Sequence, residues 1–229
     1  MPTPRMDTYL PPVSASTQDS GHTSAASRQG QIGLVLIQDV GAQDAAPKIS
    51  ANGATYLATR AVAYLEAALP GTAYRLVSVM ESEAERTTPL PLRQIVERHG
   101  VDTAAVVLLS AVETAAPQPM ALDGNRAGGG AMGRLPGTVT SVFALAEIAV
   151  VEVASGKRML TASGRGHTEL EQLARGMVSN AFPSIYREGT EQRIPAPEDD
   201  ETAHDLVRSL AFDEALRQAT VALGATRGR

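Results

Sequence analysis

Strand-like and helix-like segments alternate along the first half of this sequence. A short apolar run over residues 32–37, a β-branched run over 73–81 and a third run over 102–113 are typical of strands. Between them, residues 50–71 carry apolar side chains at helical spacing and end in Pro70 and Gly71, and residues 89–101 place Pro91 at a helix start. The order β-α-β-α-β predicts an α/β fold with helices packed on a sheet.

The second half begins with a predicted β-hairpin. Strand-like runs over residues 140–153 and 157–166 flank the turn sequence ASGK. Residues 167–182 show a helical stripe with Thr168 and Glu171 at capping-box spacing, and residues 202–224 predict a final helix that ends at Gly224. The fold class is therefore α/β, with a single mixed β-sheet, helices packed on it and a C-terminal helix.

The 229 residues predict one folded domain preceded by a tail. Residues 1–30 are rich in Ser, Thr, Pro and Gly and predict a disordered N-terminal tail. Residues 31–229 form the expected α/β domain. Within it we expect a mobile loop at 113–140, which is rich in Gly and Pro, and a polar excursion at 183–201.

Composition disfavours several classes of function. A net charge of −5 and an aromatic content of 3% argue against a nucleic acid partner, because such a partner needs a basic surface and stacking rings. The absence of cysteine excludes disulfides, Cys-ligated metals and a lipidated cysteine in these residues. No run is long and apolar enough for a transmembrane helix, and the first 30 residues lack the apolar core of a signal peptide.

The glycine run Gly128, Gly129 and Gly130 is the strongest candidate for a cofactor site. A phosphate-binding loop leads into a helix, whereas this run leads into the strand-like segment 140–153. The four histidines lack the spacing of a helical metal site, and no nucleophile-elbow motif occurs. We therefore expect no cofactor, no metal and no catalytic residue.

Three segments resemble a known family of envelope proteins. They are DTAAVVLLSAVE (102–113), FALAEIAVVEVASGKRMLTASGRG (143–166) and AFDEALRQATVAL (211–223). They resemble the periplasmic proteins related to the curli-secretion lipoprotein CsgG and the penicillin-binding-protein activator LpoB, which have a comparable strand pair around a Thr-Gly turn. The resemblance covers roughly residues 31–165 and 202–224. It implies a non-enzymatic protein, periplasmic or associated with the outer membrane, that binds protein partners or assembles with itself.

A binding role places the partner contacts on the predicted loop, because long loops in compact domains are often functional. We expect the contacts at Arg126, Met132, Arg134 and Leu135, since Arg and Met are favoured at interfaces. Two alternatives remain open. One is a soluble α/β enzyme with its site at the strand ends, near Asp39, Glu81 and Glu113; the other is a structural subunit of a homo-oligomer.

Overall fold

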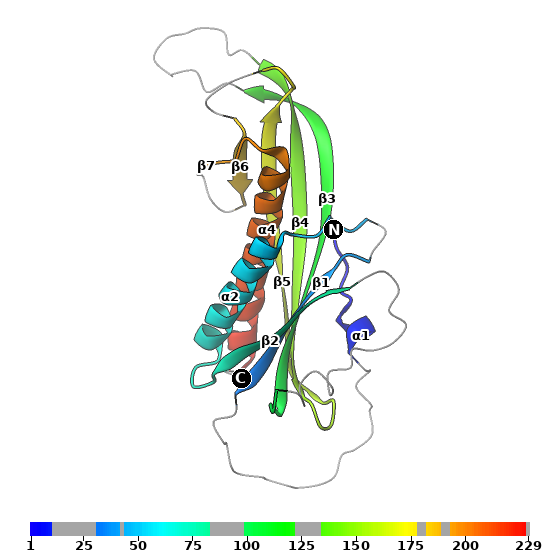
Figure 1. The fold of residues 1–229 in the computed structure, drawn as a ribbon, viewed down its shortest axis with the longest axis vertical. Helices are drawn as coiled ribbons and strands as arrows, with labels where there is room; N and C mark the ends of the chain where they lie inside the picture. Colours follow the sequence, from blue (N-terminus) through cyan, green and yellow to red (C-terminus); the bar gives the residue numbers. More distant parts are fainter. Residues whose placement is uncertain are drawn as a thin grey trace.

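The fold is a seven-stranded mixed sheet with two long helices on one face (Figure 1). The computed structural model describes residues 1–10, 31–41, 44–82, 99–121, 134–177, 182–188 and 193–227. The strands are β1 (Ile32–Asp39), β2 (Tyr74–Ser82), β3 (Thr103–Ala121), β4 (Arg134–Glu152), β5 (Arg158–Leu173), β6 (Ser184–Arg187) and β7 (Ile194–Pro195), and the helices are α1 (Met6–Tyr9), α2 (Ala51–Ala68) and α4 (Asp200–Arg227). The sheet order is β2-β1-β3-β4-β5-β6-β7, with β1 parallel to β2 and β3 and the other pairs antiparallel. The predicted fold class is confirmed.

Local sequence patterns account for several of the elements. The apolar run of β1 is buried on both faces, as its composition predicts. Ser50 caps α2 by accepting a hydrogen bond from the Gly53 N–H at 3.1 Å. The predicted hairpin joins β4 to β5, and Gly156 adopts a φ of 68° in its turn, a conformation that glycine reaches without strain. The predicted helix at 89–101 lies largely in residues that the structure does not describe.

Helix α4 lies directly against the backbone of β5. A methyl group added at Gly166 would lie 2.1 Å from the carbonyl oxygen of Ala211, and one at Gly164 would lie 2.2 Å from the Ala219 nitrogen. Two glycines on the strand and small alanines on the helix therefore allow a close approach that no larger residue permits. Helix α2 packs beside α4, so the two helices bury the main core against one face of the sheet (Figure 1).

The N-terminal residues cover part of the opposite face. Met6, Tyr9 and Leu10 are buried in a second core cluster with side chains of β1, β3 and β4. Arg5 pairs with the buried carboxylate of Asp39 at 2.8 Å. The prediction of a disordered tail over 1–30 is therefore wrong for the first ten residues. Their few apolar side chains are enough to hold this segment against the exposed face of the sheet. Residues 11–30 lie outside the described part.

Strand β5 replaces the first half of the helix predicted at 167–182. It continues to Leu173, and residues 168–171 pair with β6. Leu170 and Leu173 have a helical spacing, but the buried residues of β5 recur at every second position from 164 to 170, and the pairing with β6 decides for a strand. Thr168 and Glu171 thus lie in a strand rather than in a capping box.

The other boundary predictions need three corrections. Strand β3 continues to Ala121 and β4 begins at Arg134, so much of the loop predicted at 113–140 is a β-hairpin. Residues 122–133 lie outside the described residues. The excursion at 183–201 contributes β6 and β7 to the sheet edge. Helix α4 continues past Gly224 to Arg227, because its packing on the sheet outweighs the low helix propensity of one glycine.

We predict that Gly166→Ala lowers the free energy of unfolding by about 3 kcal/mol, because the added methyl group meets the α4 backbone. The matched control is Gly224→Ala, where the nearest atom outside the helix backbone is 3.5 Å away. That change should raise the free energy of unfolding by up to about 1 kcal/mol through helix propensity. Urea unfolding followed by far-UV circular dichroism measures both, and equal effects would contradict the close packing.

A second prediction concerns Glu147, whose carboxylate accepts hydrogen bonds from the Arg5 and Met6 N–H groups at 2.7 and 3.3 Å. Burial raises the pKa of the Glu147 carboxyl above its ordinary value, and the two backbone donors oppose that shift. A raised folded-state pKa favours folding at low pH, and this contribution is lost as the pH rises through that pKa. The stability of the wild type relative to Glu147→Gln should therefore increase as the pH falls from about 7 to about 4. Chemical unfolding across that range tests the sign, and an increase toward neutral pH would refute it.

Candidate functional site

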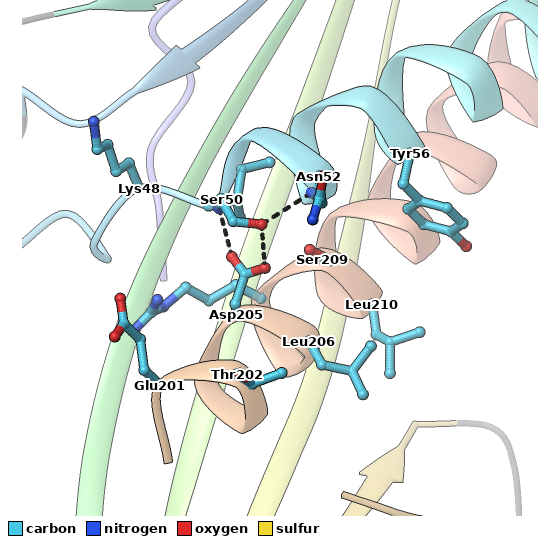
Figure 2. A pocket seen from close by; sticks show the side chains of 13 residues that line it. Lys48, Ser50, Asn52, Tyr56, Glu201, Thr202, Asp205, Leu206, Ser209 and Leu210 are labelled. Atoms are coloured by element: carbon cyan, nitrogen blue, oxygen red, sulfur yellow. Dashed lines mark hydrogen bonds between the residues drawn. The ribbon is translucent and has the colours of Figure 1, made fainter. Parts of the chain in front are cut away.

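A hollow of about 700 Å³ opens between the N-terminal end of α2 and the first turns of α4 (Figure 2). We call it the α2–α4 hollow. Its lining comes from the segment before α2, from α2 and from α4: Lys48, Ile49, Ser50, Asn52, Gly53, Tyr56, Glu201, Thr202, Asp205, Leu206, Arg208, Ser209 and Leu210. These residues are about 150 positions apart in the sequence, so only the packing of α2 on α4 brings them together.

The floor of the hollow links the two helices. Asp205 accepts hydrogen bonds from the N–H and the hydroxyl of Ser50, each at 2.6 Å (Figure 2). The carboxylate thus lies at the positive N-terminal end of α2, where negative charge is favourable. Farther along, Asp213 of α4 accepts hydrogen bonds from Arg60 and Tyr64 of α2, each at 3.0 Å. These two aspartates hold α2 and α4 in register around the hollow.

The wall of the hollow is apolar and partly open to solvent. Leu206 and Leu210 project from successive turns of α4, and the Tyr56 ring stands on the same side of the hollow (Figure 2). Tyr56 is 42% exposed, which is high for a large aromatic side chain. Ser209 lies behind this wall, and its buried hydroxyl has no hydrogen-bond partner in the part of the chain that the structure describes. The hollow therefore combines apolar contact area with one hydroxyl whose bonding capacity is unused.

A charged network borders the hollow on the side of the sheet. Glu113 of β3 accepts a hydrogen bond from the Arg208 Nε at 2.5 Å, and its other oxygen lies 2.7 Å from the His204 Nδ1. The three side chains are largely shielded from water, with exposures of 11% to 21%. Both oxygens of the carboxylate are engaged, so the network fixes α4 to β3.

The residues predicted to contact a partner lie elsewhere. Arg134 and Leu135 open β4 at the end of the β3–β4 hairpin, with Arg134 exposed and Leu135 half-buried. Arg126 and Met132 lie outside the described residues. Neither Arg134 nor Leu135 lines the α2–α4 hollow, so these contacts stay a prediction about a second place on the molecule.

The residues of the alternative enzyme site do not form one cluster. Asp39 faces the N-terminal residues and pairs with Arg5, whereas Glu113 faces α4 on the opposite side of the sheet. Glu81 pairs with Gln38 through the backbone, and its side chain lies outside the described part of the structure. Within the described residues, no group of three or more His, Asp or Glu side chains could hold a metal ion.

Sequence reasoning missed the α2–α4 hollow. In the sequence, the apolar lining residues cannot be distinguished from other apolar helix residues. No sequence motif predicts the contact between Ser50 and Asp205. One local signal existed, because Ser50 precedes the helical stripe at an N-cap position. An N-cap residue indicates where a helix begins, but it does not indicate which distant side chain will contact that helix end.

Comparison with known proteins gives a structural match without a sequence match. No protein-family model matches the chain, and no curated protein matches its sequence. The fold is similar to that of a neuraminyllactose-binding hemagglutinin homolog from Helicobacter pylori, with a TM-score of 0.36 and 9% sequence identity over 81% of this chain and 81% of that chain. None of the described helices has the length and apolar composition needed to cross a membrane.

We predict that Glu113→Ala lowers the free energy of unfolding by about 3 kcal/mol, because it leaves Arg208 and His204 shielded from water without their acceptor. The control is Glu188→Ala, which removes a carboxylate whose side chain is 72% exposed and should change stability by less than about 0.5 kcal/mol. Thermal unfolding of both variants beside the wild type measures the difference. Similar values would mean that the network does not fix α4 to the sheet.

Proposed function

We propose that this protein is a non-enzymatic binding protein of the cell envelope, and that its α2–α4 hollow receives an apolar side chain from a protein partner. The observation that carries the proposal is the combination of an open apolar wall with carboxylates that are already bonded to neighbouring groups. The envelope setting, periplasmic or at the outer membrane, rests on the sequence resemblance to the proteins related to CsgG and LpoB.

The bonding of the carboxylates favours binding over catalysis. A general base must reach a proton of the substrate, and a nucleophile needs such a base beside it. Asp205 is engaged by Ser50, and Glu113 is engaged by His204 and Arg208. Neither carboxylate presents a free oxygen pair to the hollow, so both act as supports for the surrounding helices.

The apolar wall suits a side chain of a partner protein. Tyr is enriched among the residues that dominate binding energy, because its ring offers a large rigid contact area. Tyr56 lies beside Leu206 and Leu210, while Lys48 and Glu201 stand at the rim (Figure 2). An apolar centre with a charged rim is the usual anatomy of a protein interface.

The end of the β3–β4 hairpin supplies a second candidate contact. Residues 114–119 of β3 are all exposed, and the two strands remain paired as far as Ala121 and Arg134. Arg134 and Leu135 lie on the regular backbone of a paired hairpin. Binding there loses less conformational entropy than binding to an irregular loop. Arg126 and Met132 complete the contact set expected from the sequence.

We predict that Tyr56→Ala weakens partner binding at least tenfold, a change of about 1.4 kcal/mol or more, because it removes the aromatic part of the wall. The probe is the tightest peptide selected from a phage-displayed random library against the wild type and titrated by calorimetry. The matched control is Leu76→Ala on β2, which is also 42% exposed and should leave the affinity unchanged.

Two results would count against the hollow. Equal affinity of the peptide for wild type and Tyr56→Ala would place the binding elsewhere. Light scattering of the wild type that reports a closed oligomer, dispersed by Tyr56→Ala, would assign the hollow to self-assembly and support the structural-subunit alternative instead.

A further inference from the structure

Strand β5 is much longer than the strand beside it. Strand β6 pairs only with residues 168–171, whereas β5 begins at Arg158. Among the described residues, positions 160–166 of β5 have a strand on one side only, where β4 pairs with them. Figure 1 shows β6 beside one end of β5. We call residues 160–166 the free edge.

The outward backbone groups of the free edge can be assigned from its neighbours. The Glu188 N–H donates to the His167 carbonyl oxygen at 3.4 Å, across the β5–β6 side. Backbone groups alternate between the two sides of a strand, so the outward groups belong to Thr161, Ser163 and Arg165. The side chains of these three residues are exposed. The free edge thus offers three sets of backbone donors and acceptors to an added strand.

Residues 160–166 lack three common protections of an exposed edge. Natural edges are often blunted by proline, by inward-pointing charges or by a bulge. Residues 160–166 contain no proline, and Ala162, Gly164 and Gly166 face the helix side without charge. A register shift between Val150 and Val151 marks the start of the regular pairing, beyond which seven residues run without interruption.

The free edge leads into a second hollow of about 730 Å³ where β6 ends. Its lining includes Arg165 and His167 of β5, Arg187 of β6, and Glu214, Arg217 and Gln218 of α4. The His167 ring stacks on Phe143, with ring centroids 4.4 Å apart. A strand that extended the sheet beside the free edge would pass its side chains into this hollow.

Charge indicates which side chains the added strand would carry. Arg165 is exposed and makes no ion pair or hydrogen bond with the part of the chain that the structure describes. Arg217 and Arg187 stand on the same hollow and share Glu214, at 2.7 and 3.6 Å. Glu188 also lines the hollow, and Arg187 pairs with Asp213 at 3.7 Å as well. Arg165 is therefore the arginine of this lining that has no carboxylate partner among the described residues, and an acidic side chain opposite it is favoured.

A second copy of this chain is disfavoured as the occupant. Two copies joined edge to edge would bring their β5 strands to about 4.8 Å. Residues 160–166 contain no Asp or Glu, so the free edge of a second copy would place no carboxylate opposite Arg165. We therefore expect a partner strand that carries acidic side chains.

We propose that residues 160–166 bind an extended acidic segment of a partner protein, which adds to the sheet as a strand beside β5. Main-chain hydrogen bonds to Thr161, Ser163 and Arg165 supply the affinity, and the pairing of acidic side chains with Arg165 supplies the selectivity. This surface is separate from the α2–α4 hollow, so the two can be tested independently.

The test uses the full chain and a synthetic nine-residue peptide with blocked ends, in which glutamate alternates with alanine and valine. With the peptide in excess, the amide protons of Thr161, Ser163 and Arg165 should exchange with solvent at least about tenfold more slowly in NMR. The amides of Ala162 and Gly164, which face β4, should be protected from the start and change little. A peptide with lysine in place of glutamate should bind at least about tenfold more weakly.

The decisive variant is Ser163→Pro, which removes an outward N–H and leaves the bonds to β4 in place. It should weaken peptide binding at least about tenfold, whereas Ser163→Ala should bind like the wild type. If Ser163→Pro fails to fold by circular dichroism, Arg165→Glu replaces it and should reverse the preference between the two peptides. Tyr56→Ala should leave this binding unchanged.

Three outcomes would overturn the proposal. The first is no binding of the glutamate peptide at concentrations up to about 1 mM. The second is binding without slower exchange at the three outward amides. The third is a dimer in light scattering that Ser163→Pro disperses, because it would assign the free edge to a second copy of the chain.

Discussion

The contact between the α4 backbone and the glycines of β5 determines the arrangement of the rest of the molecule. Gly164 and Gly166 let α4 settle so close to the strand that no Cβ fits between them, with Ala211, Ala215 and Ala219 on the helix side. This proximity decides where the other faces of α4 point. One side meets α2 through Asp205 and Asp213, and another overhangs the free edge of β5. The α2–α4 hollow and the free edge are both consequences of the same contact.

The two faces of the sheet bury different amounts of apolar surface. The polar contacts of the N-terminal residues compensate for the smaller burial on their face. The face under α2 and α4 holds the larger core, whereas the described part of the chain covers the opposite face with the short N-terminal segment of residues 1–10. So short a segment buries little apolar surface, and directed polar contacts supplement it. Arg5 bonds to Asp39, and Glu147 accepts from two backbone N–H groups. Burying Glu147 disfavours its ionised form, so this attachment is weakest where the carboxyl is charged.

The spacing of apolar residues correctly predicted the elements in which that spacing matches only one type of secondary structure. The run of β1 and the stripe of α2 each match a single period, and the turn at Gly156 carries its own signal. The helix prediction for residues 167–182 failed because the three-residue spacing of Leu170 and Leu173 matches a helix, whereas local spacing does not reveal the pairing of residues 168–171 with β6. The prediction for the N-terminal residues failed for a different reason: their burial depends on a sheet face built from β1, β3 and β4, none of which is adjacent to them in the sequence. The contacts of Ser50 with Asp205 and of Glu113 with Arg208 are of the same long-range kind, so the site lay beyond local patterns.

Both proposed surfaces use α4, but at different turns. The α2–α4 hollow draws on residues 201–210, and the lining beside the free edge draws on residues 214–218. A helix rises about 1.5 Å per residue, so the two sets are centred about 15 Å apart along the axis. One partner could therefore place an apolar side chain in the hollow and an acidic strand along β5 without conflict. Two such contacts on one rigid helix would act together, since the first to form raises the effective concentration of the second. Each contact can then be weak by itself and still contribute to a stable complex.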